Sequence, residues 1–264
     1  MWKKQVVDEN FNFFYPTYTN QTETKVTRKG GFGCCRSTFM TINIVNKIDN
    51  LVKVQRVLVS VSDKTDLEQL IPGLLDINPQ IQFFSTGGTF SKIKKILGNK
   101  WESSLTPVSD YTGQPETQGG LVKTLDFKIY LGLLTETYNN SHHEDLQRTN
   151  AVPIDMVVVN LYPFQQTISK PDVTPEMARG NIDNGGPCMI RASAKNFLRV
   201  ASVVDPSDYL QILSWLKDNN GCTSLDIRYK LACKAFGHTA EYDATITDFF
   251  KSISFDEVRN CYRL

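Results

Sequence analysis

Two short polar segments of the sequence have the composition of phosphate-binding loops. Ser62-Asp63-Lys64-Thr65 follows the apolar run Val57-Leu58-Val59, and Thr86-Gly87-Gly88-Thr89 follows Ile81-Gln82-Phe83-Phe84. Each segment lies where a buried strand would end and a helix would begin, so its free N–H groups and hydroxyls would face an anion. Lys64 would add a positive charge, although a plain tight turn and a surface lysine are the structural alternatives. Neither segment is a Walker A loop or a G-x-G-x-x-G fingerprint, which argues against nucleoside triphosphates and dinucleotides.

Two further segments suit the recognition of a ligand. Lys123 and Thr124 follow the pair Gly119-Gly120, as in a binding loop, with an ordinary exposed loop as the alternative. Asn160 and Tyr162 follow the β-branched run Val157 to Val159, where a base or ribose would be read. The alternative there is a Tyr-Pro turn packed on the core.

Proton transfer could involve a carboxylate and an amine further along the chain. Asp183 and Asn184 precede Gly185-Gly186, which we expect to begin a helix, and Lys195 lies two to three turns along that helix. A desolvated lysine can lose its proton near neutral pH, so this pair is a candidate acid and base. A capping aspartate and a solvated lysine are the alternative.

The elements that must position these residues alternate between strand and helix. Short apolar runs are followed by amphipathic segments, which is typical of βαβ units and predicts an α/β fold with a mostly parallel sheet flanked by helices. Thr65 or Ser62 is expected to cap the first helix, through Leu67, Leu70 and Leu74. Ligands of such sheets bind at the carboxyl ends of the strands, where all these segments fall.

Composition narrows the classes of function. The 264 residues carry 29 Lys and Arg against 28 Asp and Glu, which gives a net charge of +1 and no basic stripe for nucleic acid. The six cysteines form no C-x-x-C pair, and no secretory or membrane-spanning run is apparent. We therefore expect a cytoplasmic protein with no metal site, no membrane contact and no nucleic-acid partner.

Three parts of the chain differ in composition. Residues 1–55 lack a helical or strand period and are interpreted as an N-terminal extension, disordered or non-catalytic. Residues 56–222 contain the alternating elements and form the predicted catalytic domain. Residues 223–264 are predicted to be helical, as one long helix or two between Leu225 and Phe250.

Taken together, these segments resemble the IMP cyclohydrolase domain of the bifunctional purine-biosynthesis family, which joins it to an AICAR transformylase domain. The motifs occur in the family's order and near its spacing. They are V-S-D-K-T (61–65), S-T-G-G-T (85–89), V-S-D-Y-T-G (108–113), V-K-T-L (122–125), V-V-V-N-L-Y-P-F (157–164), N-I-D-N-G-G-P (181–187), R-A-S-A-K-N (191–196), V-V-D-P-S-D-Y (203–209) and K-A-F-G-H-T-A-E-Y-D-A-T-I (234–246).

The resemblance implies a fold, a reaction and a set of roles. The fold would be a three-layer sandwich like that of methylglyoxal synthase, and the activity would be closure of 5-formamido-imidazole-4-carboxamide ribonucleotide (FAICAR) to inosine monophosphate (IMP) by a homodimer, without cofactor. The implied catalytic residues are Lys195, Lys123, Tyr162 and Asp183. The implied nucleotide-binding residues are Ser62, Asp63, Lys64, Thr86, Gly87, Gly88, Thr89, Thr124, Asn160 and Asn184. Residues 223–264 would end where the transformylase domain otherwise begins.

Departures from the family pattern leave two other functions open. Leu121 stands where the family has an arginine in its nucleotide-binding stretch, and Asp126-Phe127 replaces His-Pro. A lost charge-assisted contact of that kind costs on the order of 1.5–3 kcal/mol. One alternative is a non-catalytic or degraded nucleotide-binding or phosphate-binding module of the same fold. The other is a methylglyoxal synthase-type lyase, whose characteristic loop is not found here.

Overall fold

The computed structural model describes residues 44–115 and 123–263, and all of these except Ile44 belong to one compact unit, Val45–Leu264. Its centre is a five-stranded sheet in the order β4-β3-β2-β5-β6, in which every neighbouring pair is parallel. The strands are β2 (Arg56–Val61), β3 (Gln82–Ser85), β4 (Leu105–Pro107), β5 (Met156–Asn160) and β6 (Ala201–Val203). The predicted α/β fold with a parallel sheet is therefore confirmed.

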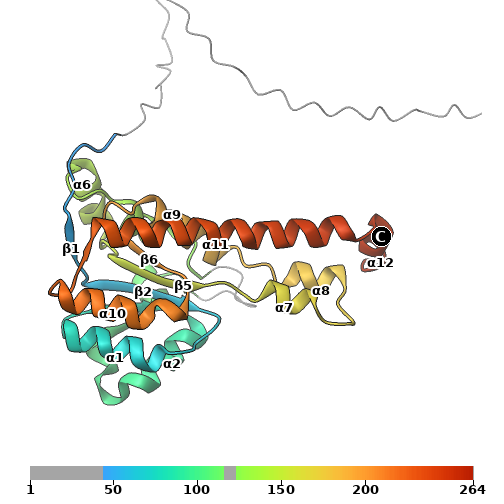
Figure 1. Cartoon of the computed structure of the whole chain (residues 1–264), viewed down its shortest axis with the longest axis horizontal. Coiled ribbons are helices and arrows are strands. Elements are labelled where there is room, and N and C mark those ends of the chain that lie inside the picture. Colours follow the sequence, from blue (N-terminus) through green and yellow to red (C-terminus); the bar gives the residue numbers. More distant parts are fainter. Residues whose placement is uncertain (1–43, 116–122, 264) are drawn as a thin grey trace, which may run out of the picture. The chain divides into compact units, whose positions relative to one another are not determined.

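Helices cover both faces of this sheet (Figure 1). One layer contains α1 (Leu67–Ile77), α2 (Gly87–Leu97) and α10 (Tyr209–Asp218). The other contains α4 (Val108–Thr112), α5 (Phe127–Leu134), α9 (Gly185–Lys195) and part of α11 (Leu225–Ser252). The remaining described helices are η1 (Gly98–Lys100), α3 (Trp101–Ser104), α6 (Asn140–Thr149), α7 (Phe164–Ile168), α8 (Pro175–Gly180), η3 (Pro206–Asp208) and α12 (Phe255–Asn260).

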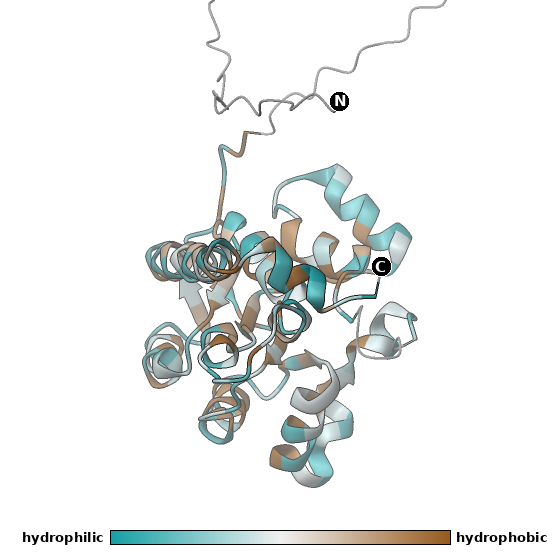
Figure 2. Cartoon of the chain, turned by 90° about the vertical axis from the view of Figure 1, so that its right-hand side faces the viewer, coloured by the Kyte–Doolittle hydropathy of each residue, from teal (hydrophilic) through white to brown (hydrophobic). Residues whose placement is uncertain are grey.

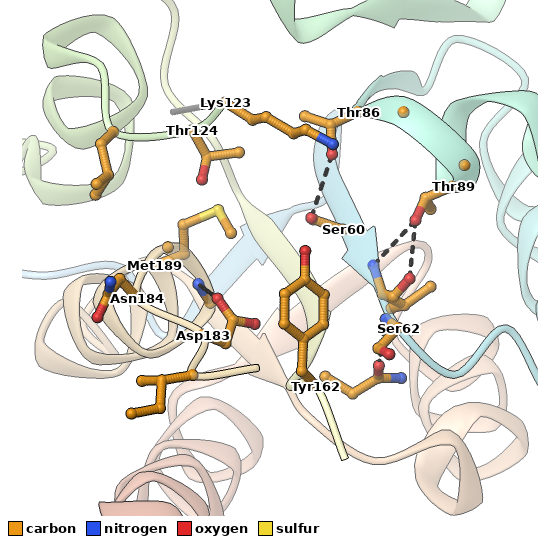
Figure 3. A pocket seen from close by; sticks show the side chains of 18 of the residues that line it. Ser60, Ser62, Thr86, Thr89, Lys123, Thr124, Tyr162, Asp183, Asn184 and Met189 are labelled. Carbon is orange, nitrogen blue, oxygen red and sulfur yellow. Dashed lines mark hydrogen bonds between the residues drawn. The ribbon is translucent and has the colours of Figure 1, made fainter. Parts of the chain in front are cut away.

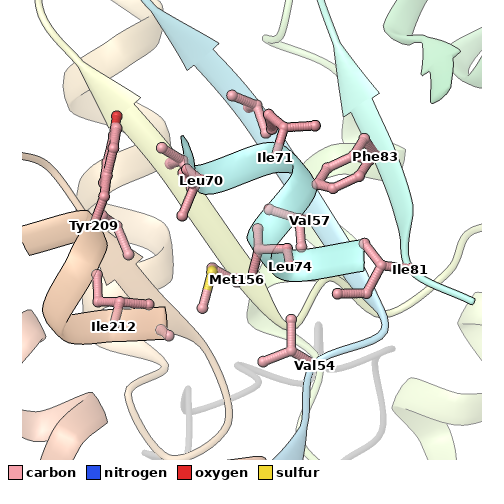
Figure 4. Packing of buried hydrophobic residues seen from close by; sticks show 14 of the residues in the cluster. Val54, Val57, Leu70, Ile71, Leu74, Ile81, Phe83, Met156, Tyr209 and Ile212 are labelled. Carbon is pink, nitrogen blue, oxygen red and sulfur yellow. The ribbon is translucent and has the colours of Figure 1, made fainter. Parts of the chain in front are cut away.

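The central strands are apolar on both sides because both sides are covered. Val57 and Val59 face the α1 layer, whereas Leu58 faces the α9 layer, as expected when successive side chains of a strand alternate. Figure 4 shows Leu70, Ile71 and Leu74 of α1 packed over Val57. In Figure 2 the apolar residues gather on the helix faces turned toward the sheet. This burial fixes the strand ends, and with them the loops that follow.

A second, smaller sheet extends beyond both boundaries of the predicted catalytic domain, 56–222. Strand β1 (Leu51–Lys53) pairs antiparallel with β7 (Cys222–Ser224), and Val54 next to β1 is buried. Residues before Arg56 therefore take part in the fold. Helix α11 begins directly after β7 and buries Ile227 and Leu231 in the hydrophobic core between the sheet and the α1 layer. The start of segment 223–264 therefore also takes part in the fold.

Two local predictions have clear outcomes. Segment Leu225–Ser252 is one helix, and among the described residues no helix is long and apolar enough to cross a bilayer. The predicted capping of α1 by Thr65 or Ser62 is wrong. Asp66 is the N-cap, in the left-handed region with φ of 58°, and makes no side-chain cap. The Asp63 carboxylate instead accepts hydrogen bonds from the N–H and hydroxyl of Thr65, at 2.9 and 2.6 Å.

Candidate functional site

A cavity of about 370 Å³ opens at the carboxyl ends of β2, β3 and β5. Strand order reverses between β2 and β5, and parallel α/β sheets bind ligands at such switch points. The volume of the cavity is in the range of small-molecule sites. Figure 3 shows its polar side chains. The lining residues are Ser60, Val61, Ser62, Lys64, Thr86, Gly87, Gly88, Thr89, Lys123, Thr124, Leu125, Asn160, Tyr162, Gly180, Ile182, Asp183, Asn184, Gly185, Gly186 and Met189.

One end of the cavity combines two lysines with the glycine pair that begins α2. Gly87 has φ of +45°, a conformation that L side chains rarely adopt. A Cβ on Gly87 would lie 3.3 Å from Lys123 Nζ, and one on Gly88 would lie 3.9 Å from Lys64 Nζ. The first-turn N–H groups of a helix lack helical acceptors, and they carry partial positive charge. This end is therefore suited to an anion such as phosphate.

Asn160 fixes the loop that carries Lys64. Its Oδ1 accepts hydrogen bonds from the N–H groups of Ser62 and Asp63 at 2.7 and 2.8 Å, and its Nδ2 donates to the carbonyl of Asp63 at 2.8 Å. These bonds cross the switch point from β5 to the end of β2. Since both ends of its amide are engaged, Asn160 holds the loop in place rather than offering a free group to a base.

Hydroxyls join the two strand ends nearest the anion end. Thr89 Oγ1 accepts from Val61 N–H at 3.2 Å and donates to the Val61 carbonyl at 3.0 Å, and its side chain is buried. Ser60 and Thr86 hydroxyls lie 3.4 Å apart. The start of α2 is therefore tied directly to β2, which keeps the Gly87-Gly88 turn beside the Lys64 loop.

The opposite side of the cavity contains Asp183 at the start of α9. Its carboxylate accepts the Gly186 N–H at 2.9 Å and is also hydrogen-bonded by the N–H groups of Gly185 and Tyr162. Burial raises the pKa of this carboxyl, and the three N–H groups oppose that rise. Desolvation dominates, so Asp183 holds a proton more readily than a free aspartate does. Asp183 lies one residue before the N-cap Asn184, accepts an N–H of the first turn of α9, and is a candidate base.

Tyr162 stands between these two ends. It lies two residues beyond β5, and its side chain is 48% exposed. Figure 3 shows its hydroxyl directed into the space between Asp183 on one side and Ser60 and Thr86 on the other. Thr124 also lines this space and is buried, and its Oγ1 would lie 3.0 Å from a Cβ on Gly185. A glycine at 185 therefore allows Thr124 to approach the start of α9.

Most residues singled out in the sequence meet in this one cavity. Those that line it are Ser62, Lys64, Thr86, Gly87, Gly88, Thr89, Lys123, Thr124, Asn160, Tyr162, Asp183 and Asn184. Asp63 does not, because its carboxylate is turned to Thr65. Leu121 lies outside the described residues.

Lys195 is the expected catalytic residue that the cavity does not include. It is exposed and is the last residue of α9, ten residues after Gly185. At a rise of 1.5 Å per residue, that separation is about 15 Å along the helix axis. The expectation that Asp183 and Lys195 share one pocket is not met by this arrangement.

Several lining residues were missed by sequence reasoning. Ser60 is a polar residue near the end of an apolar strand, on the same face as Leu58, and this alternation could have indicated it. Leu125, Ile182 and Met189 add apolar contacts, and ordinary hydrophobic residues give no such signal. Within the described ranges, no group of three or more His, Cys, Asp or Glu side chains is placed to hold a metal ion.

The comparisons with known proteins point to one family. The model of the AICARFT/IMPCHase bienzyme matches residues 193–263. The bifunctional purine biosynthesis protein PurH of Bacillus subtilis (strain 168) is 44% identical over 200 residues, which are 76% of this chain and 38% of that protein. PurH of Synechococcus sp. (strain CC9605) is 45% identical over 189 residues, 72% of this chain and 35% of the relative. The chain thus spans little more than a third of the length of these relatives.

A solved structure matches over almost its whole length. The crystal structure of ForH aligns with a TM-score of 0.65 and 30% identity, and it covers 75% of this chain and 97% of its own.

Proposed function

The chain belongs to the AICARFT/IMPCHase family, and from this premise we propose that it is an IMP cyclohydrolase. The substrate would be FAICAR and the product IMP, within purine biosynthesis. In the reaction the carboxamide nitrogen attacks the formyl carbon, which forms the new C–N bond of the ring. The carboxamide nitrogen loses one of its two protons, the formamido nitrogen loses its only one, and the formyl oxygen leaves with both as water. The C=N bond forms between the former formyl carbon and the formamido nitrogen, so one substrate gives IMP and one water.

The anion end of the cavity would hold the 5′-phosphate. Lys64 and Lys123 lie beside the glycine turn, and the first residues of α2 line the same space. The resemblance implies that Lys123 reaches the reacting groups, whereas its position over Gly87 favours the phosphate. We therefore assign both lysines to binding, where they would compensate for the absence of arginine at position 121.

The base would then lie toward Tyr162 and Asp183. Asp183, with its raised pKa, would accept a proton from the carboxamide nitrogen, and the Tyr162 hydroxyl would donate a hydrogen bond to the formyl oxygen as charge develops there. Holding the two groups of one substrate together removes much of the entropic cost of ring closure. The main support for this proposal is that one cavity presents cations at one end and a desolvated carboxylate beside a tyrosine at the other.

A non-catalytic nucleotide-binding module is the second candidate. The position of Lys195 favours it, because the residue implied as proton donor and acceptor is exposed and outside the cavity. If the chemistry resides in the cavity, Lys195→Ala should keep turnover within about threefold, as for most surface substitutions. A much larger loss would return Lys195 to the mechanism.

The test is direct. FAICAR is incubated with the chain, and IMP formation is followed by absorbance against a sample without protein. Formation well above the spontaneous rate is expected, and binding of IMP without any acceleration would instead support the module. Homodimer formation, implied by the family, is checked separately by sedimentation velocity.

A further inference from the structure

Helix α11 carries Tyr242, whose side chain reaches the start of the Asp183 segment. The Tyr242 hydroxyl oxygen accepts the backbone N–H of Asp183 at 2.8 Å. Tyr242 is half-buried against the core cluster of the α9 layer, and burial raises the pKa of its phenol. Among the candidate site residues, Asp183 is the one whose backbone is held from this distant helix.

The same ring supports the segment that carries Tyr162. Phe164, two residues after Tyr162 and almost fully buried, meets the Tyr242 ring edge to face, with centroids 6.2 Å apart. Phe249, also on α11, packs edge to face against Phe164, with ring centroids 5.9 Å apart. One side chain of α11 thus contacts both segments that present the reacting groups.

We propose that Tyr242 is a positioning residue that sets the placement of Asp183 relative to Tyr162, an inference that rests on the proposed cyclohydrolase function. The Asp183 carboxylate lies close against the start of α9, in space that a Cβ on Gly186 would occupy, since such an atom would lie 2.6 Å from the carboxylate oxygen. Its N–H group is fixed by Tyr242, while its carboxylate is fixed by N–H groups of Gly185, Gly186 and Tyr162. Loss of the phenolic oxygen frees the backbone of Asp183 and weakens the hydrogen bonds that oppose its protonation.

The variant Tyr242→Phe isolates this contact, since it keeps the ring that packs on Phe164 and removes only the acceptor. Tyr229→Phe is the matched control: Tyr229 lies on the same helix, its ring contacts Phe197, and its hydroxyl makes no hydrogen bond within the described chain. The first measurement is hydrogen–deuterium exchange at the Asp183 amide. Exchange is expected to be about tenfold faster in Tyr242→Phe, as for loss of one hydrogen bond, and unchanged in Tyr229→Phe.

The second measurement is turnover of FAICAR across pH. In Tyr242→Phe we expect kcat to fall about tenfold with KM within about twofold, because the phosphate contacts are intact. We also expect the acid limb of kcat to move to higher pH, a shift that simple loss of folded protein would not produce. Unchanged exchange at Asp183, or an unchanged kcat and acid limb in an active protein, would overturn the proposal. If the wild type shows no turnover, the proposed function fails, and the exchange measurement alone decides whether Tyr242 positions Asp183.

Discussion

Two opposing electrostatic effects act on the carboxyl group of Asp183. Burial raises the pKa of its carboxyl above the ordinary value of 3.8, whereas the N–H groups at the start of α9 favour the charged form. The N–H groups of a helix N-terminus alone would lower the pKa of the carboxyl, whereas burial alone would raise the pKa and favour the neutral acid. The combination leaves a carboxyl whose pKa is raised by burial and whose charged form is still supported by backbone N–H groups.

A pH profile tests that assignment. A general base acts in its ionised form, so kcat should fall as pH decreases through the pKa of Asp183. Because that pKa is raised, the midpoint of the fall should lie above 3.8. Circular dichroism at each pH verifies that the protein stays folded. A midpoint at or below the ordinary aspartate value would remove Asp183 as the base.

Lys64 offers a test that needs no turnover. Lys64→Met should weaken IMP binding about tenfold or more, because a charge-assisted contact with phosphate is worth roughly 1.5–3 kcal/mol. Binding of inosine, which lacks the phosphate, should not change. Calorimetry measures both affinities. The control is Lys95→Met on α2, an exposed lysine that does not line the cavity. Equal losses for IMP and inosine would show that Lys64 does not bind phosphate.

At the scale of elements, the loops are held by contacts between residues far apart in sequence. Asn160 at the end of β5 fixes the Ser62-Asp63 turn, and Thr89 in α2 fixes Val61 at the end of β2. Each contact joins one strand end to its neighbour in the sheet. The geometry of the binding loops therefore depends on which strands are neighbours in the sheet, and it is not determined by any single loop.

Asn160→Ala tests this dependence. It leaves the N–H groups of Ser62 and Asp63 without an acceptor, so the free energy of unfolding should fall by about 1–3 kcal/mol and IMP should bind more weakly. Urea denaturation and calorimetry measure the two effects. Asn139→Ala is a matched control, because it removes the cap of remote helix α6 at a cost of about 1 kcal/mol. Normal IMP affinity in Asn160→Ala would contradict the account.

The elements were predicted from the sequence more completely than the contacts between them. Apolar runs bounded by glycine and polar residues predicted the central strands, and their parallel order placed the phosphate loops together. The sequence did not predict whether Asp63 would face the cavity. Its carboxylate instead accepts a hydrogen bond from the backbone N–H of Thr65, two residues away. The exposure of Lys195 depends on the rotation and length of α9, and the role of Tyr242 depends on how α11 crosses the α9 layer. A one-dimensional pattern specifies neither.

At the scale of the whole molecule, Arg228 joins segments from both ends of the described fold. Its fully buried guanidinium donates to carbonyls of Asp49 and Asn50, which precede β1, and of Phe197 and Leu198, which precede β6. Desolvation lowers its pKa to about 10, so it stays charged near neutrality. Since Arg228 lies in α11, this cluster fixes the same helix that presents Tyr242 to the site.

Arg228→Met should therefore destabilise the entire unit. Several carbonyls would lose their donor inside the protein, and we expect the free energy of unfolding to fall by at least about 3 kcal/mol in urea denaturation. Arg148→Met, which removes an exposed ion pair with Asp145, should change it by less than about 1 kcal/mol. Similar values for the two variants would show that the buried cluster contributes little to holding α11.

The central claim is that the cavity closes the purine ring, and its most direct test is the initial rate of IMP formation from FAICAR with wild type and Asp183→Asn at equal concentrations. Asparagine preserves size but cannot accept the proton. We expect IMP formation well above the spontaneous rate for the wild type and a loss of about 100-fold or more for Asp183→Asn with IMP still bound. Equal rates for the two proteins, or a wild-type rate no higher than the spontaneous one, would contradict it.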